Sequence, residues 1–227
     1  MRKPVVDYRT LRLSNITSPQ FRHLFLLLGW VGYFLMYFLT ENLIPAEACH
    51  VIHSPLDNLI PFNEVFVVPY VAWYAFIAVS LVWFALYDIE SFKKLSIFII
   101  VTQVLAMAVY IIYPSRQDLR PESFERDNIF TWILGLIYSF DTNTGVCPSL
   151  HVAYSIGIAS VWLKCRGVSK LRKSFVCVSM FLVCISVAFV KQHSVVDIWA
   201  ALPVCFVAEA VAYGKDYWLP KFKRKRE

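Results

Sequence analysis

Two ionisable residues in the last fifth of the chain have a spacing that suits catalysis. His193 and Asp197 lie four residues apart, just after an apolar run that ends at Val190. If the chain is helical from Ser194 onward, the two side chains lie one turn apart on the same face. A carboxylate placed there accepts a hydrogen bond from one imidazole nitrogen and fixes the tautomer, so the other nitrogen becomes a better base or nucleophile. The alternative is a structural pair at the start of a helix.

The composition places this pair in a membrane protein. Of 227 residues, 58% are hydrophobic and 17% are charged, whereas soluble domains average about 45–50% apolar and about 25% charged residues. An ionisable side chain in a membrane helix is a candidate functional residue by default. The sequence therefore predicts a single all-α, polytopic membrane domain in which the few charged residues carry information.

Six apolar segments are expected to cross the bilayer as a helical bundle. Residues 1–23 are a basic cytoplasmic segment, residues 24–213 the catalytic membrane domain, and residues 214–227 a basic cytoplasmic tail. The expected spans are residues 24–39, 65–87, 95–113, 150–163, 175–190 and 194–213. Residues 129–140 are apolar and aromatic, but they are too short for a hydrocarbon core that needs about twenty residues. They are expected to form an interfacial helix on the outer face.

The distribution of Lys and Arg sets the expected orientation, because cytoplasmic loops carry an excess of both. With both termini inside, only four of the 22 Lys and Arg residues lie outside: Arg116, Arg120, Arg126 and Lys191. We expect a multi-pass protein of the plasma membrane with an outward-facing site, although an internal membrane with a lumenal site has the same topology. The basic C-terminal run is expected to attract anionic lipids, not nucleic acid.

Three polar clusters far apart in the sequence meet the outer face under this topology. Arg120 follows the third span, His151 begins the fourth, and His193 begins the sixth. A helix start offers free backbone N–H groups and the positive end of a dipole, which favour a phosphate. Ser149 could cap the fourth span or donate to the anion. Arg120 offers a planar fork for phosphate oxygens, and Lys191 offers a point charge. The clusters together predict phosphoryl transfer.

These clusters resemble the type 2 phosphatidic acid phosphatase superfamily of membrane lipid phosphatases and phosphotransferases. The family pattern has three parts: K-x6-R-P, then P-S-G-H, then S-R-x5-H-x3-D. Here Arg120-Pro121 matches the end of the first part, and Pro148–His151 matches the second except at its glycine. Ser186, His193 and Asp197 match the third part with the right spacing. The order along the chain and the placement at span ends are similar as well.

The resemblance implies a role for each matching residue. His193 would attack phosphorus and form a phosphohistidine, with Asp197 orienting it. His151 would protonate the leaving group and then activate the incoming water. The phosphoryl oxygens would be held by Arg120, Ser149 and the amides near Leu150. No metal and no cofactor are implied, because fixed cations and helix dipoles take their place. The substrate would be a lipid phosphomonoester or diphosphate hydrolysed at the outer face.

Two cations of the family pattern are missing. The family Lys of the first part falls at Tyr113, and the family Arg of the third part falls at Val187. Lys191, Arg116 or Arg126 could hold the phosphate in their place, and we expect Lys191 and Arg116 to do so.

Other functions stay open at this point. Leu150 stands where the family has glycine, and P-S-L-H is similar to the inositol phosphorylceramide synthase branch, which passes a phosphoryl-alcohol group between lipids. A lipid phosphotransferase is therefore the alternative enzyme. A transporter or a catalytically inactive lipid-binding bundle is the alternative outside the enzymes, although no internal repeat or midplane polar cluster supports transport. The lipid and the oligomeric state are left open.

Overall fold

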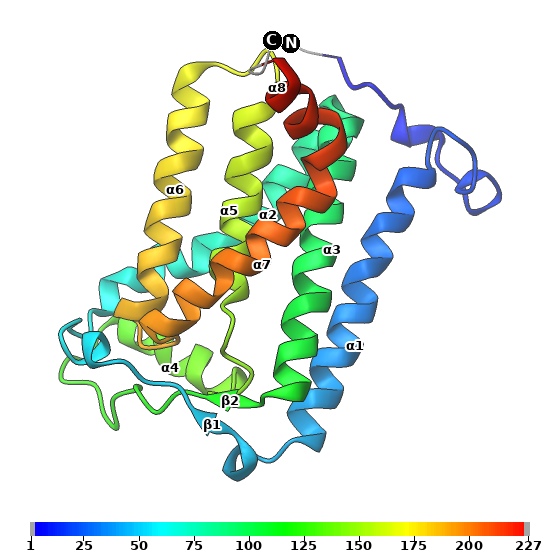
Figure 1. The fold of residues 1–227 in the computed structure, drawn as a ribbon. Helices are drawn as coiled ribbons and strands as arrows, with labels where there is room; N and C mark the ends of the chain where they lie inside the picture. Colours follow the sequence, from blue (N-terminus) through cyan, green and yellow to red (C-terminus); the bar gives the residue numbers. More distant parts are fainter. Residues whose placement is uncertain (1–2, 225–227) are drawn as a thin grey trace.

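The computed structural model describes residues 3–224, and its regular structure is almost entirely helical (Figure 1). Three of the cations counted toward the orientation, Arg2, Lys225 and Arg226, lie outside the described residues. Within the described residues, five helical segments are long and apolar enough to cross a membrane: Arg22–Leu43, Glu64–Tyr87, Ile89–Ile112, Lys170–Phe189 and Val195–Lys223. The protein is therefore an all-helical chain with the character of a membrane protein.

The elements follow the order expected from the apolar runs. The helices are α1 (Leu28–Leu43), α2 (Val67–Tyr87), α3 (Ile89–Ile112), α4 (Ile129–Phe140), α5 (Leu150–Lys164), α6 (Lys170–Phe189), α7 (Val195–Tyr213) and α8 (Leu219–Arg224). Short 3-10 turns precede α1 and α2, and a π-helical turn, Gly214–Trp218, joins α7 to α8. The strands β1 (His50–Val51) and β2 (Ser115–Arg116) pair in parallel and tie the α1–α2 loop to the chain after α3.

Helix caps explain why two helices, α3 and α6, begin before their apolar runs. α3 begins six residues before the expected start at residue 95, because Asp88 accepts a hydrogen bond from the backbone N–H of Ser91. α6 likewise begins at Lys170, because Ser169 accepts from the N–H of Arg172. A capped helix continues through its polar first turn, whereas hydropathy marks only the apolar part. α4 has the bounds expected from the sequence.

α5 is the central helix of the bundle. It contacts α2, α3, α6 and α7, and most of its residues are buried. It crosses α3 closely at Gly157, where a Cβ atom would overlap the ring of Phe98. Its 15 residues span only about 22 Å at 1.5 Å per residue, which explains why it is not among the five long apolar segments.

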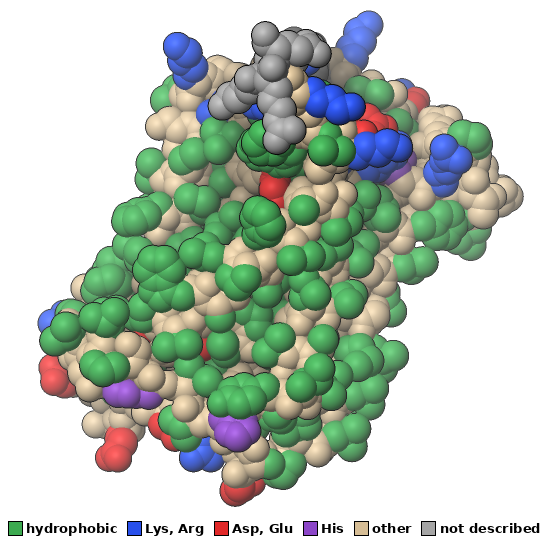
Figure 2. Space-filling model, viewed as in Figure 1, with side chains coloured by type: hydrophobic (Ala, Val, Ile, Leu, Met, Phe, Trp, Pro, Cys, Tyr) green, Lys and Arg blue, Asp and Glu red, His purple; other side chains and the backbone are tan. Residues whose placement is uncertain are grey.

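The two ends of the bundle differ in what they carry. Both termini and α8 lie at one end, and β1, β2, α4 and the starts of α5 and α7 lie at the other (Figure 1). The visible Lys and Arg side chains gather at the end with the termini, while the sides of the bundle are mainly hydrophobic (Figure 2). The three polar clusters noted in the sequence therefore share one end of the molecule, opposite the termini.

Candidate active site

The turn between α6 and α7 positions His193. Lys191 has a left-handed backbone, with φ of 54°, and the chain folds back there so that two successive N–H groups, of Gln192 and His193, both donate to the carbonyl of Val187 at 2.9 and 3.1 Å. Ser194 then caps α7 by accepting from the N–H of Val196. Side chains just before and within the first turn of α7 are consequently fixed in direction.

His193 and Asp197 form the pair that their spacing predicts. Nδ1 of His193 lies 3.2 Å from Oδ2 of Asp197, and the same oxygen accepts the N–H of Ser194 at 3.0 Å. Asp197 is fully buried. A carboxylate that accepts from Nδ1 favours the tautomer with the proton on that nitrogen. Nε2, on the other side of the ring, is left as the nucleophilic or basic atom in the cavity that His193 lines.

A buried acid from a distant loop holds this turn from outside. Asp57, in the α1–α2 loop, accepts from Ser194 Oγ at 2.6 Å and from the N–H of Val195 at 2.7 Å. Lys191 Nζ donates in return to the carbonyls of Asp57 and Ile60 at 2.9 and 2.6 Å. Sequence reasoning did not select Asp57. The available signal was local: Ser54 and Asp57 form a capping box, which marks a built turn.

His151 lies in the first turn of α5, in an aromatic stack. Its ring centroid is 4.6 Å from that of Tyr70 and 4.1 Å from that of Trp73, both on α2. The ring centroid of His193 is 5.6 Å away. Nε2 of His151 is buried without a hydrogen-bond partner among the described residues. A buried polar atom normally has a partner, so this nitrogen is available to a substrate oxygen.

The starts of α5 and α7 are bonded to each other. The N–H of Ser149 donates to the carbonyl of Asp197 at 3.1 Å, and Oγ of Ser149 is buried with no partner among the described residues. Leu150 lines the same cavity as the two histidines. Ser149 can therefore offer its hydroxyl, but its backbone amide is already used.

Arg120 reaches the edge of this site through Gln192 and Thr142. Its Nε and Nη2 donate to Oε1 of Gln192 at 3.1 and 2.6 Å, and Nη2 also donates to the carbonyl of Thr142 at 2.7 Å. The guanidinium lies over the ring of Tyr138, 4.6 Å from its centroid. Both Gln192 and Thr142 line the cavity, so Arg120 stands directly behind its wall.

The other three cations expected on this face have partners elsewhere. Arg116 donates to the carbonyl of Ala46 and pairs with Asp118. Arg126 pairs with Glu64. Lys191 binds the carbonyls of the α1–α2 loop described above. None of the three lines the cavity, so the structure does not bring Lys191 and Arg116 to the site where the sequence places them.

The two positions of the missing family cations are not filled in another way. The ring of Tyr113 stacks on that of His50, with centroids 4.2 Å apart. Val187 is fully buried and apolar. Among the cations that the sequence analysis selected, Arg120 is the one whose side-chain partners line the cavity.

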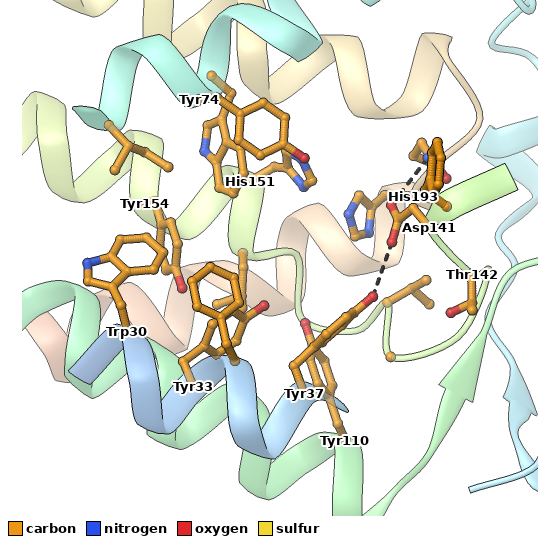
Figure 3. A pocket seen from close by; sticks show the side chains of 18 of the residues that line it. Trp30, Tyr33, Tyr37, Tyr74, Tyr110, Asp141, Thr142, His151, Tyr154 and His193 are labelled. Atoms are coloured by element: carbon orange, nitrogen blue, oxygen red, sulfur yellow. Dashed lines mark hydrogen bonds between the residues drawn. The ribbon is translucent and has the colours of Figure 1, made fainter. Parts of the chain in front are cut away.

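The cavity itself combines a polar end with an aromatic one (Figure 3). Its volume is about 530 Å³. His151, His193, Gln192 and Asp141 line the polar end, and the rest is lined mainly by apolar and aromatic side chains of α1 and α2. Phe34 on α1 and Tyr74 on α2 line the cavity and are each 59% exposed. The cavity therefore reaches the lateral surface of the bundle between α1 and α2, where lipid would lie.

Asp141 is a second acid of the site, which the sequence analysis did not select. Its carboxylate accepts from the hydroxyl of Tyr37 at 3.2 Å and from Nε2 of Gln192 at 3.4 Å (Figure 3). Burial raises the pKa of Asp141, and the charge of Arg120 opposes that rise. The available signal was its position directly after α4, in the loop that leads to His151.

Comparisons of the chain with protein-family models, with curated proteins and with solved structures find no match. The functional argument therefore rests on the site: a carboxylate-bonded histidine, a second histidine with a free buried nitrogen, one nearby guanidinium, and an apolar cavity open toward the lipid side.

Proposed function

We propose that this protein is an integral membrane enzyme that cleaves a lipid phosphoester through a phosphohistidine at His193. The observation that carries the proposal is the common cavity of His193 and His151, with Asp197 bonded to Nδ1 of His193 and an apolar arm that opens between α1 and α2. The resemblance of the three motifs to the type 2 phosphatidic acid phosphatase superfamily supports the same chemistry.

In the first step, Nε2 of His193 attacks phosphorus and the bond from phosphorus to the leaving oxygen breaks. Asp197 stabilises the positive charge that develops on the imidazole. His151 gives its proton to the leaving alcohol, for which its unpartnered Nε2 is placed. Arg120 and the hydroxyl of Ser149 stabilise the phosphoryl oxygens, with Arg120 turning from Gln192 toward the phosphate.

In the second step, an acceptor attacks the phosphohistidine and the bond from phosphorus to Nε2 breaks. His151, now neutral, takes the acceptor's proton and returns to its starting state. Water as the acceptor gives a phosphatase, and a lipid alcohol gives a phosphotransferase. Both reactions use the same residues. How well the apolar arm excludes water would decide how well an alcohol competes with water as the acceptor.

The membrane arrangement is part of the proposal. α5 also crosses the membrane and brings the number of spans to six; it is short because its start lines a polar cavity instead of lipid, and α4 lies in the interface. The bundle end that bears the termini and most cations faces the cytoplasm, so the site faces outward. The plasma membrane is the default location.

Phosphate release by the detergent-purified full chain tests the proposal. A panel of lipid phosphoesters would be incubated in the presence of EDTA with the wild-type protein and with His193→Ala. We expect metal-independent cleavage by the wild type and an acid-labile phosphorylated His193, detected by mass spectrometry, in wild type alone. A folded protein that neither cleaves any lipid nor becomes phosphorylated would instead be the non-catalytic bundle.

A further inference from the structure

The charges around the cavity bear on whether a singly or a doubly charged phosphate binds there. No Lys or Arg is among the cavity-lining residues that the structure describes, and Arg120 stands behind the wall. Four of its five N–H groups already have acceptors in Tyr138, Thr142 and Gln192. Among the described residues, the site therefore offers a substrate the shared charge of Arg120 and the proton that His151 carries for the leaving group.

The acids near the cavity reduce that charge further. Asp141 lines the same polar end as His193 and has no ion pair with a cation in the described residues; its partners are Tyr37 and Gln192. A dianionic phosphate next to His193 would meet this carboxylate in a partly desolvated space, where like charges repel strongly. With Asp141 ionised, Arg120 and a protonated His151 leave one net positive charge, which a phosphate with a single negative charge balances.

The apolar arm of the cavity indicates where the hydrocarbon chain of the substrate would lie relative to its phosphate. It runs from the histidines along Trp30, Phe34 and Tyr74 to the lateral surface. A hydrocarbon chain in this arm would place its phosphate at the polar end, with the phosphate's second ester group beside Asp141 and Thr142. A hydroxyl or ammonium on that second group could donate to Asp141.

We propose, on the basis of the phosphohistidine function above, that the substrate is a lipid phosphodiester and that Asp141 is the residue that excludes phosphomonoesters. Attack by His193 then breaks the bond from phosphorus to the chain-bearing alcohol, which leaves with a proton from His151. Phosphorus keeps its second ester group on His193 until a water or an alcohol takes it. Phosphatidic acid, a phosphomonoester of the class that the resemblance implies, is a poor substrate under this proposal.

Two ligands with the same hydrocarbon chain test the effect of phosphate charge on binding. Dodecyl phosphate is a dianion near neutral pH, and its methyl ester is a monoanion. Binding to the full chain in nanodiscs would be followed at pH 8 by tryptophan fluorescence, since Trp30 and Trp73 line the cavity. His193→Ala would be the background, so that no turnover occurs. We expect the methyl ester to bind roughly tenfold more tightly, and Asp141→Asn to remove most of that preference.

Asp118→Asn is the control, because it removes the same charge from the same face but outside the cavity, where Asp118 pairs with Arg116. It should leave the preference unchanged. Equal or tighter binding of dodecyl phosphate, or an equal effect of both variants, would overturn the proposal.

Turnover separates this proposal from the function on which it rests. Wild type and Asp141→Asn would be given phosphatidic acid and phosphodiester lipids with the same acyl chains, and alcohol release would be measured. We expect wild type to prefer the diesters and Asp141→Asn to gain on phosphatidic acid by roughly tenfold in kcat/KM. His193-dependent cleavage that favours phosphatidic acid would refute the diester inference alone. No His193-dependent cleavage of either lipid would refute both.

Discussion

Asp57 Oδ2 accepts a 2.6 Å hydrogen bond from Ser194 Oγ, although the two residues are 137 positions apart. The other carboxylate oxygen accepts from the N–H of Val195, and Lys191 closes the contact by binding the carbonyl of Asp57. A loop outside the helical bundle thus holds the residues on both sides of His193. The direction of the His193 ring depends on a contact between residues far apart in the chain, which no local pattern describes.

Asp57→Ala should destabilise the protein, because it removes a buried acceptor from two donors at the start of α7. We expect a loss of about 3 kcal/mol in the free energy of unfolding, which for a chain of this size lowers Tm by roughly 6–12 °C. Thermal unfolding in detergent would measure it. Asp57→Asn keeps one acceptor oxygen, so its Tm should lie between those of Asp57→Ala and the wild type. An unchanged Tm for Asp57→Ala would show that the contact does not hold the turn.

Asp197→Asn should impair catalysis more than stability. The amide can still accept from the N–H of Ser194, but it brings no charge to stabilise an imidazolium and can leave His193 in the wrong tautomer. We expect kcat to fall by about 10²–10⁴-fold with KM little changed. Cleavage rates and the amount of phosphorylated His193 would be measured together. A loss explained by a parallel fall in Tm would argue against an orienting role.

Substitution of Arg120 should lower kcat/KM much more than substitution of Arg116, because only Arg120 stands behind the cavity wall. Arg120→Ala should lower kcat/KM by about 100-fold, since a charged donor to the phosphoryl oxygens is lost. Arg116→Ala should change it by less than about threefold, because Arg116 binds Ala46 and Asp118 instead. A large effect of Arg116→Ala on kcat/KM, with an unchanged Tm, would restore the phosphate-binding role expected from the sequence.

Asp141 should make stability depend on pH with a definite sign. Burial raises the pKa of Asp141 in the folded protein, so folding favours its protonated form. The resulting destabilisation is absent below the ordinary pKa of a carboxyl group and is fully present once the pH exceeds the raised value. Asp141→Asn should therefore be more stable than wild type at pH 7, and the gain should vanish as the pH falls toward 3. Tm measured across this range for both proteins tests it. A constant difference across the range would contradict the prediction.

The sequence by itself determined where the helices lie along the chain and where the three polar motifs lie relative to them. Apolar runs predicted the helices because burial and lipid contact require continuous apolar residues, and α4 has the predicted bounds. The spacing of His193 and Asp197 was sufficient because residues four apart on one helix are neighbours whatever the rest of the chain does. The alternating direction of the expected helices also placed the three motifs at one end of the bundle, where the structure has them (Figure 1).

Only the tertiary structure decided which charges serve the site. Lys191, Arg116 and Arg126 have long flexible side chains with several partners within reach, so their sequence positions could not show that carbonyls and acids elsewhere bind them. Asp57 and Asp141 gain their roles from loops that fold onto the ends of distant helices. Such contacts depend on packing between residues far apart in the chain, and no local periodicity encodes them.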